Sequence, residues 1–208
     1  MSILEKALSV LNQYLSYSRY CHSIRVGETA RCFADRFKLS LEDAYLAGIL
    51  HDIAKPATPD NTYGQKIVFS EFENQLYEEF PRVWHAFVGP KYVNACCGSI
   101  SLEIADAIMY HTTGTADMDP FTEILYVSDF VEPGRNTILS NYVNKCAQEN
   151  FYHAIFAITV SNIDKLKKRK LKIHPETLNC FNFYKERVQE SARKSIFLSL
   201  KISEDKFC

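Results

Sequence analysis

Apolar residues recur at intervals of three and four along most of the chain, whereas clean alternation over a strand length is hard to find. This spacing places apolar side chains on one face of a helix. The pattern therefore predicts an all-α fold. Neither an internal repeat nor a domain-scale linker interrupts the pattern, so we expect a single helical domain over residues 1–208.

Helix starts are marked by capping residues, which accept hydrogen bonds from the free N–H groups of a first turn. The predicted caps are Ser2 with Glu5, Ser40 with Asp43, Ser101, and Asp119 before Pro120. A second helix starts near Ser18 and carries His22 on its apolar stripe. Pro56 cannot continue the helix that starts at Ser40, which leaves His51 and Asp52 at the end of that helix.

The rest of the chain shows further helical segments. In chain order we expect an acidic amphipathic piece over 67–80, helices over 81–98 and 101–111, a helix from Asp119, a turn over 132–135, and helices over 140–170 and 176–200. A break near Asn150 is expected in the first of the last two helices, because the helical pattern weakens there.

Charge narrows the classes of partner. The chain has 24 Lys and Arg residues against 25 Asp and Glu residues, a net charge of -1. A protein that binds nucleic acid or an anionic membrane through bulk charge carries a large positive excess, so neither is expected as a partner. Any site for a phosphate group must be local.

Targeting and redox signals favour a cytoplasmic protein. The first ten residues lack a basic segment followed by an apolar one, so no signal peptide is expected. The most apolar stretch, 151–160, is far shorter than the ~20 residues that span a bilayer, and His153 interrupts it. The seven cysteines have no CxxC spacing and fit neither a disulfide framework nor a thiolate zinc site, so we expect reduced thiols.

Candidate chemistry lies at the inner faces and ends of these helices. The histidines and aspartates concerned are His22, His51, Asp52, His85, His111 and Asp129. Consecutive helical residues point about 100° apart, so His51 and Asp52 can hold one ion together only at a helix end. His22 and Asp129 would add an imidazole and a carboxylate, which completes a set of two nitrogen and two oxygen ligands with positions open for water.

Four segments resemble the HD superfamily of metal-dependent phosphohydrolases and, within it, the bacterial YqeK family. They are 22–26 (HSIRV), 46–55 (LAGILHDIAK), 110–114 (YHTTG) and 129–135 (DFVEPGR). The resemblance implies an HD-domain helical bundle with a metal and phosphate core over about 18–135. The helices over about 140–200 would pack on that core and close the nucleotide site. It also implies an enzyme that hydrolyses an acid anhydride, cleaving diadenosine tetraphosphate symmetrically to two ADP.

Site residues follow from the same resemblance. The metal ligands it implies are His22, His51, Asp52 and Asp129, with iron as the usual ion. His85 and His111 match two histidines near the phosphates or a second ion. Contacts to nucleoside diphosphate are implied for Arg19, Thr112 and Arg135, and for the C-terminal segment with Ile173, His174 and Thr177.

Several assignments have alternatives at this stage. Imidazole and carboxylate suit manganese, cobalt, nickel and zinc as well as iron, and one or two ions would fit. Lys55, Arg25 and Arg135 are candidates to cancel phosphate charge, although Arg25 would equally form a surface ion pair. The basic run over 165–172 is more often a solvated face than a binding site, but it would attract anionic nucleotides.

Other functions also fit the motifs. One is hydrolysis of a different nucleotide, because the ligand set defines the reaction type better than the substrate. Another is a di-iron oxygenase of the HD type, in which His85 and His111 complete a two-iron site. A third is a regulator that binds a nucleotide without turning it over. In each case the partner is a small nucleotide or metabolite, and a homodimer is an open alternative to a monomer.

Overall fold

The computed structural model describes residues 1–207, and within that range the chain forms helices and no β-strand. The N-terminal helices are α1 (Ile3–Tyr14), α2 (Tyr17–Phe37), α3 (Leu41–Leu50), α4 (Glu71–Glu79), α5 (Pro81–Cys96), α6 (Leu102–Tyr110) and α7 (Pro120–Val131). The C-terminal elements are η1 (Pro133–Arg135), α8 (Ile138–Glu149), α9 (Phe151–Lys168), α10 (Pro175–Arg187), α11 (Glu190–Leu200) and η2 (Glu204–Phe207). The predicted all-α fold is confirmed.

The capping residues act as the sequence predicts. Ser2 and Glu5 form a reciprocal capping box at α1, and the side chains of Ser40, Ser101 and Asp119 accept backbone hydrogen bonds at α3, α6 and α7. The expected break at Asn150 is also present, where Asn150 ends α8 and caps α9. Local hydrogen bonding therefore sets most helix starts.

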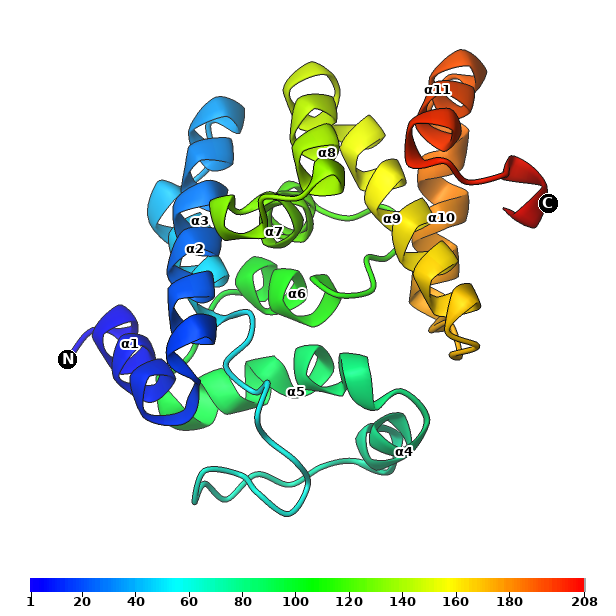
Figure 1. Ribbon diagram of the computed structural model, residues 1–208. Helices are drawn as coiled ribbons and strands as arrows, with labels where there is room; N and C mark the ends of the chain where they lie inside the picture. Colours follow the sequence, from blue (N-terminus) through cyan, green and yellow to red (C-terminus); the bar gives the residue numbers. More distant parts are fainter. Residues whose placement is uncertain (208) are drawn as a thin grey trace.

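Figure 1 shows α2 and α3 together at one side of the molecule, with α9, α10 and α11 at the other and α7 between them. Helices α4 and α5 lie below α6, and the segment over 51–70 runs across the front of the lower helices. Helix α7 contacts α2, α3 and α6 on one side and α8 and α9 on the other. It is the element through which the two groups of helices meet.

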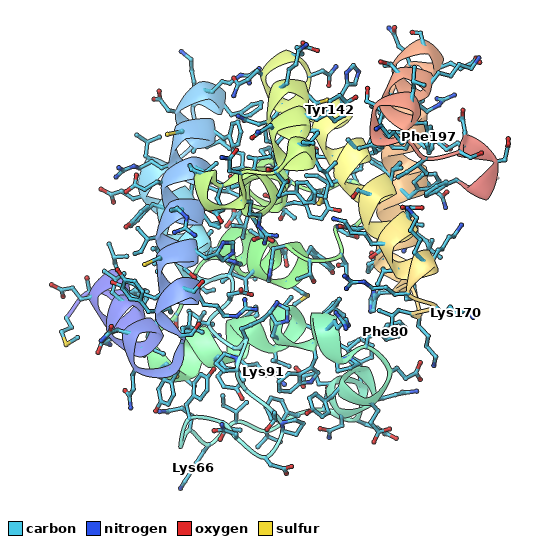
Figure 2. All side chains as sticks on the ribbon, in the orientation of Figure 1. Lys66, Phe80, Lys91, Tyr142, Lys170 and Phe197 are labelled. Atoms are coloured by element: carbon cyan, nitrogen blue, oxygen red, sulfur yellow. The ribbon has the colours of Figure 1, made fainter. Side chains whose placement is uncertain are left out.

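The buried side chains form two clusters, one on each side of α7. The first lies among α1, α3, α5 and α6 and includes Leu11, Leu50, Trp84, Tyr92 and Ile108. The second lies among α7 to α11 and the outer ends of α2 and α3, and includes Tyr126, Phe156, Tyr184 and Phe197, with Tyr142 packed against it (Figure 2). Leu125 of α7 belongs to the first cluster and Ile124 to the second, so α7 contributes to both.

Two predicted segments differ from the structure. The single helix expected over 176–200 is two helices, α10 and α11, separated at Val188 and Gln189. The amphipathic piece expected over 67–80 is helical only from Glu71, because Ser70 caps α4 there. None of the helices in residues 1–207 is both long and apolar enough to span a bilayer.

The cysteines in the described part of the chain are free: Cys21, Cys32, Cys96, Cys97, Cys146 and Cys180. This agrees with the expectation of reduced thiols for those six. Cys208 lies outside the described residues.

Candidate metal centre

Backbone contact between α2 and α3 brings the first two histidines together. A Cβ atom on Gly48 would lie 2.5 Å from the Cα of Gly27, so the two helices touch without side chains between them. Glycine is the residue that permits this approach. The rings of His22 and His51 consequently lie with their centroids 5.2 Å apart, edge to face.

His51 and His111 occupy equivalent positions at two helix ends. They are the C-cap residues of α3 and α6, and each Nδ1 lies 2.7 Å from a carbonyl oxygen three residues earlier, that of Gly48 or Ile108. A carbonyl oxygen only accepts, so each Nδ1 carries a proton. Nε2 is left with a free lone pair, as in metal-binding histidines whose other nitrogen donates to a carbonyl.

The two aspartates face these nitrogen atoms. Asp129 Oδ1 lies 3.0 Å from His22 Nε2 and 3.8 Å from His51 Nε2. Asp52, on the turn after α3, places Oδ2 3.7 Å from His51 Nε2 and Oδ1 3.7 Å from His111 Nε2. Two groups with mutually close donor atoms result, His22 with His51 and Asp129, and His51 with Asp52 and His111. His51 belongs to both.

Burial and charge fix the protonation states of these groups. Burial lowers the pKa of His51 to about 4, which keeps the imidazole neutral at pH 7. Burial alone would raise the pKa of Asp129, but the hydrogen bond with His22 and the charge of Arg135 hold it well below its usual range. The pKa of Asp52 is likewise well below its usual range, because the histidines and Lys55 outweigh the effect of burial.

These residues fit a divalent cation. His51 Nε2 is buried and makes no hydrogen bond, whereas the buried Asp52 Oδ1 is in ion-pair contact with His85 and Lys55. Burying such atoms without a partner is costly, so native proteins rarely leave them unpaired. Neutral imidazole nitrogens and carboxylate oxygens are ligands for iron, manganese, cobalt, nickel and zinc. The donor set and the unpaired His51 Nε2 thus match a divalent ion.

His85 and Lys55 border the second group of donors. Lys55 Nζ donates to His85 Nε2 over 2.9 Å and lies 3.4 Å from Asp52 Oδ1. Burial lowers the pKa of His85 to about 3 and also lowers that of Lys55. His85 Nε2 also lies 3.2 Å from Asp52 Oδ1. Both side chains are therefore in the cluster, with His85 neutral at pH 7.

Two exposed arginines lie over the cluster. Arg19 donates to Asp52 Oδ2 over 2.8 Å and Arg135 to Asp129 Oδ1 over 2.7 Å, and each side chain is 45% exposed. Both line a pocket of about 400 Å³ that His22 and Ser16 also line. The cluster is thus reached from solvent beside guanidinium groups, which suit bidentate contacts to phosphate.

Glu132 is the residue that the sequence reasoning missed. The sequence predicts it only as part of a turn, yet its side chain is 2% exposed and accepts from Arg25 Nε over 2.5 Å. Its other oxygen lies 3.1 Å from His22 Nδ1. Arg25, a predicted phosphate contact, is thus engaged with Glu132. The signal available in the sequence was the spacing, because Glu132 follows Asp129 by three residues and Arg25 follows His22 by three.

A second pocket begins beside His111. It has a volume of about 310 Å³ and is lined by Thr112, by His174 and Thr177 at the start of α10, and by Lys165 and Arg169 at the end of α9, with His174 and Arg169 as the cap residues. Figure 2 shows that Phe80, which also lines it, lies at the α4–α5 junction on the side facing the end of α9. Ile173 does not line this pocket and packs against the second core instead.

His174 is built into the wall of the pocket. Its Nδ1 accepts the backbone N–H of Glu176 over 3.2 Å at the start of α10. The ring centroid lies 4.9 Å from that of Phe80 and 5.0 Å from that of Phe87. Burial lowers its pKa, so an aromatic, neutral face is presented on that wall at pH 7.

Known proteins are similar to this chain. The HD domain family matches residues 19–134, more than half of the chain. A Bacillus subtilis (strain 168) protein named "Bis(5'-nucleosyl)-tetraphosphatase, symmetrical" is 32% identical over 179 residues, which cover 86% of this chain and 96% of that protein. The Halalkalibacterium halodurans protein of the same name is 31% identical over 85% of this chain and 94% of its own length.

A solved structure has the same fold. It is a Clostridium acetobutylicum protein titled a "predicted HD superfamily hydrolase involved in NAD metabolism", with a TM-score of 0.77 and 24% identity over 89% of this chain and 98% of that one. Two findings show family membership and not the fold alone: the HD domain match over residues 19–134, and the 32% identity with the Bacillus protein over 86% of this chain. This chain belongs to the HD-domain family and, within it, to the family of symmetrical bis(5'-nucleosyl)-tetraphosphatases.

Proposed function

We propose that this protein hydrolyses diadenosine tetraphosphate symmetrically to two ADP. Water adds to an inner phosphorus, the central bridging P–O bond breaks, and each half leaves as ADP. The observation that carries the proposal is the buried set of His and Asp donors with its unpaired His51 Nε2, next to cationic pockets. The substrate is taken from the names of the Bacillus and Halalkalibacterium relatives.

The four ligands in this proposal are His22, His51, Asp52 and Asp129. A divalent ion held there would lower the pKa of a bound water from 15.7 toward ~7 and polarise a phosphoryl oxygen. We propose iron as the native ion, with manganese, cobalt, nickel and zinc as substitutes that the same donor types accept. His111, with His51 and Asp52, supplies the donors for a second ion.

The chain's cations would hold the phosphates. Arg19 and Arg135 are paired with the ligating carboxylates, and a cation that neutralises these carboxylates weakens their hold on the arginines. The guanidinium groups then face the pocket over the cluster and contact the equatorial oxygens that gain charge during phosphoryl transfer. Lys55 lies on the inner side of the cluster and donates to His85 Nε2. Its ammonium group would donate instead to a phosphate oxygen that takes the place of His85 Nε2.

The pocket beside Thr112 would hold one nucleoside. It adjoins the cluster through His111 and Thr112, and the aromatic edge of His174 lies on its wall with Thr177. The Thr112 hydroxyl is buried without a hydrogen-bond partner, which supports a role in contacting ligand. Ile173 would act indirectly, because it packs under the start of α10.

Two further expectations belong to this proposal. Free cysteines in the described residues support a reducing, cytoplasmic setting. A homodimer is proposed without a specific contact to support it, and light scattering at two protein concentrations tests it.

Product analysis tests the activity. Full-length protein purified without oxygen is assayed with diadenosine tetraphosphate after metal analysis of the same preparation. We expect ADP as the only nucleotide product. Release of ATP with AMP would contradict symmetric cleavage, and oxygen consumption with a polyol or phosphonate would favour an oxygenase. ADP binding without hydrolysis under iron, manganese or cobalt would favour a regulator.

A further inference from the structure

We infer that Glu132 is a positioning residue that orients His22 toward the ion, with Arg25 and Gly134 as its supports. The inference deepens the proposed function, because it rests on His22 as a ligand. It assigns a role to a buried carboxylate that contacts neither substrate nor the proposed ion.

His22 needs an orienting partner from outside its helix. His51 and His111 each donate Nδ1–H to a carbonyl at the end of their own helix. His22 lies inside α2, where the carbonyl oxygens are taken by the helix ladder, and its Nδ1 faces Glu132 Oε1 over 3.1 Å. A carboxylate that accepts from Nδ1 fixes the ring with Nε2 directed at Asp129, and a bound ion would take the place of the proton that Nε2 now shares with Asp129.

Glu132 is itself held in place from two sides. Its Oε2 accepts from Arg25 Nε over 2.5 Å and from the backbone N–H of Gly134 over 2.6 Å. The charge of Arg25 compensates the buried carboxylate, which would otherwise be costly. The three donors come from α2 and η1, so Glu132 ties the helix that carries His22 to the turn that carries Arg135.

Gly134 makes this contact sterically feasible. A Cβ atom at this position would collide with the guanidinium group of Arg25. With glycine there, Arg25 lies directly over the turn and reaches Glu132. The arrangement therefore depends on the size of residue 134 and on the charge of residue 25, both of which can be changed without touching a proposed ligand.

The test measures metal affinity with no substrate present. Metal-free full-length protein is titrated with Mn²⁺, and Glu132→Gln is expected to weaken binding by about 10–100-fold, the range found for partners of ligating residues. With Zn²⁺ bound in place of Mn²⁺, the ¹⁵N spectrum of His22 is expected to change from one tautomer to a mixture. Glu73→Gln is the matched control, because Glu73 is also buried and paired with a cation, Lys91, but lies on α4. It should leave both readouts unchanged.

A second variant tests the inference if Glu132→Gln does not fold. Gly134→Ala displaces Arg25 but keeps the Glu132 carboxylate, and it should weaken Mn²⁺ binding less than Glu132→Gln does. The inference would be overturned if folded Glu132→Gln kept the wild-type affinity for Mn²⁺ and an unchanged His22 tautomer. If Glu132→Gln does not fold, the same result in Gly134→Ala would overturn it. Since no nucleotide is used, a wrong substrate assignment leaves this result intact. Undiminished Mn²⁺ binding by His22→Ala would instead reject His22 as a ligand, and the inference with it.

Discussion

The cluster among α2, α3, α6 and α7 and the pocket wall on α9 and α10 present polar groups in different ways. In the cluster, His51 and His111 are buried at helix ends and held by specific hydrogen bonds. On α9, Lys165 and Arg169 are exposed along a helix face. The difference teaches that reaction chemistry depends here on fixed geometry, whereas attraction of a polyanion depends on charge that tolerates mobility.

Removing the ligands should produce the largest effect. The double variant His51→Ala, Asp52→Ala deletes one donor common to both groups and one carboxylate. We expect activity to fall at least about 1,000-fold, which corresponds to about 4 kcal/mol of transition-state stabilisation from the ion. Initial rates and metal content are measured together. His153→Ala, outside the cluster, is the control, and a fully active double variant would reject the site.

The next largest effect is expected from a variant that pushes α2 and α3 apart. Gly48→Ala puts a Cβ against the backbone of α2, and overpacking of this kind costs about 1–3 kcal/mol. The melting temperature should fall by at least about 2 °C, with weaker Mn²⁺ binding. Gly64→Ala is compared, because its Cβ would meet nothing and only its left-handed backbone is strained. Equal metal affinity in Gly48→Ala and wild type would contradict a geometric requirement.

Neutralising the pocket wall should have a milder, salt-dependent effect. Lys165→Ala, Arg169→Ala is expected to raise KM for diadenosine tetraphosphate by about 3–30-fold with kcat nearly constant, because these cations attract the substrate without facing the cluster. The effect should shrink as salt rises from 50 to 500 mM, as screening predicts. Lys145→Ala, on the exposed face of α8, is the control. A fall in kcat alone would place these residues in the reaction itself.

The smallest effect on activity is expected at a hydrogen bond that joins the two regions, where the change is in stability. Tyr184 of α10 donates to Glu123 of α7 over 2.6 Å, and burial raises the pKa of Glu123 to about 7 from its ordinary 4.5. Between these values the folded protein binds more protons than the unfolded chain, so stability falls as pH rises from about 4.5 to 7 and then levels. Glu123→Gln should remove a fall of up to about 3 kcal/mol, because about 2.5 pH units separate the two pKa values at ~1.4 kcal/mol each.

Urea unfolding at pH 5 and pH 8 measures that difference. Glu149→Gln, at the exposed end of α8, should keep the wild-type profile. An unchanged pH dependence in Glu123→Gln would show that Glu123 is ionised throughout this range.

Local signals were enough for most of the fold. Ser40, Ser101 and Asp119 mark helix starts because their side chains bond backbone N–H groups within three residues, which sequence spacing reveals. The break between α10 and α11 has no proline or glycine to mark it. It is stabilised by tertiary contacts, because Val188 is buried and Arg193 donates to the carbonyls of Lys185 and Val188.

Local patterns in the sequence also predict part of the candidate site. His51 and His111 are conspicuous because each ends an apolar helical pattern, and the structure brings them within 4.9 Å between ring centroids. Glu132 was not foreseeable in this way, since its partners lie more than 100 residues earlier and an isolated glutamate in a turn is normally solvated. Only the folded chain shows that it is buried against Arg25.

The order of the cluster residues along the chain has a consequence for biosynthesis. His22, Asp129 and Glu132 are all translated before α9 and α10, which supply the cationic wall and Thr177. At about 5–20 residues per second, the stretch from Glu132 to Thr177 takes roughly 2–9 s to make. The four proposed ligands are therefore synthesised seconds before the α9–α10 wall of the second pocket, so their order in the chain would let the ion's donors be made before the proposed nucleoside site.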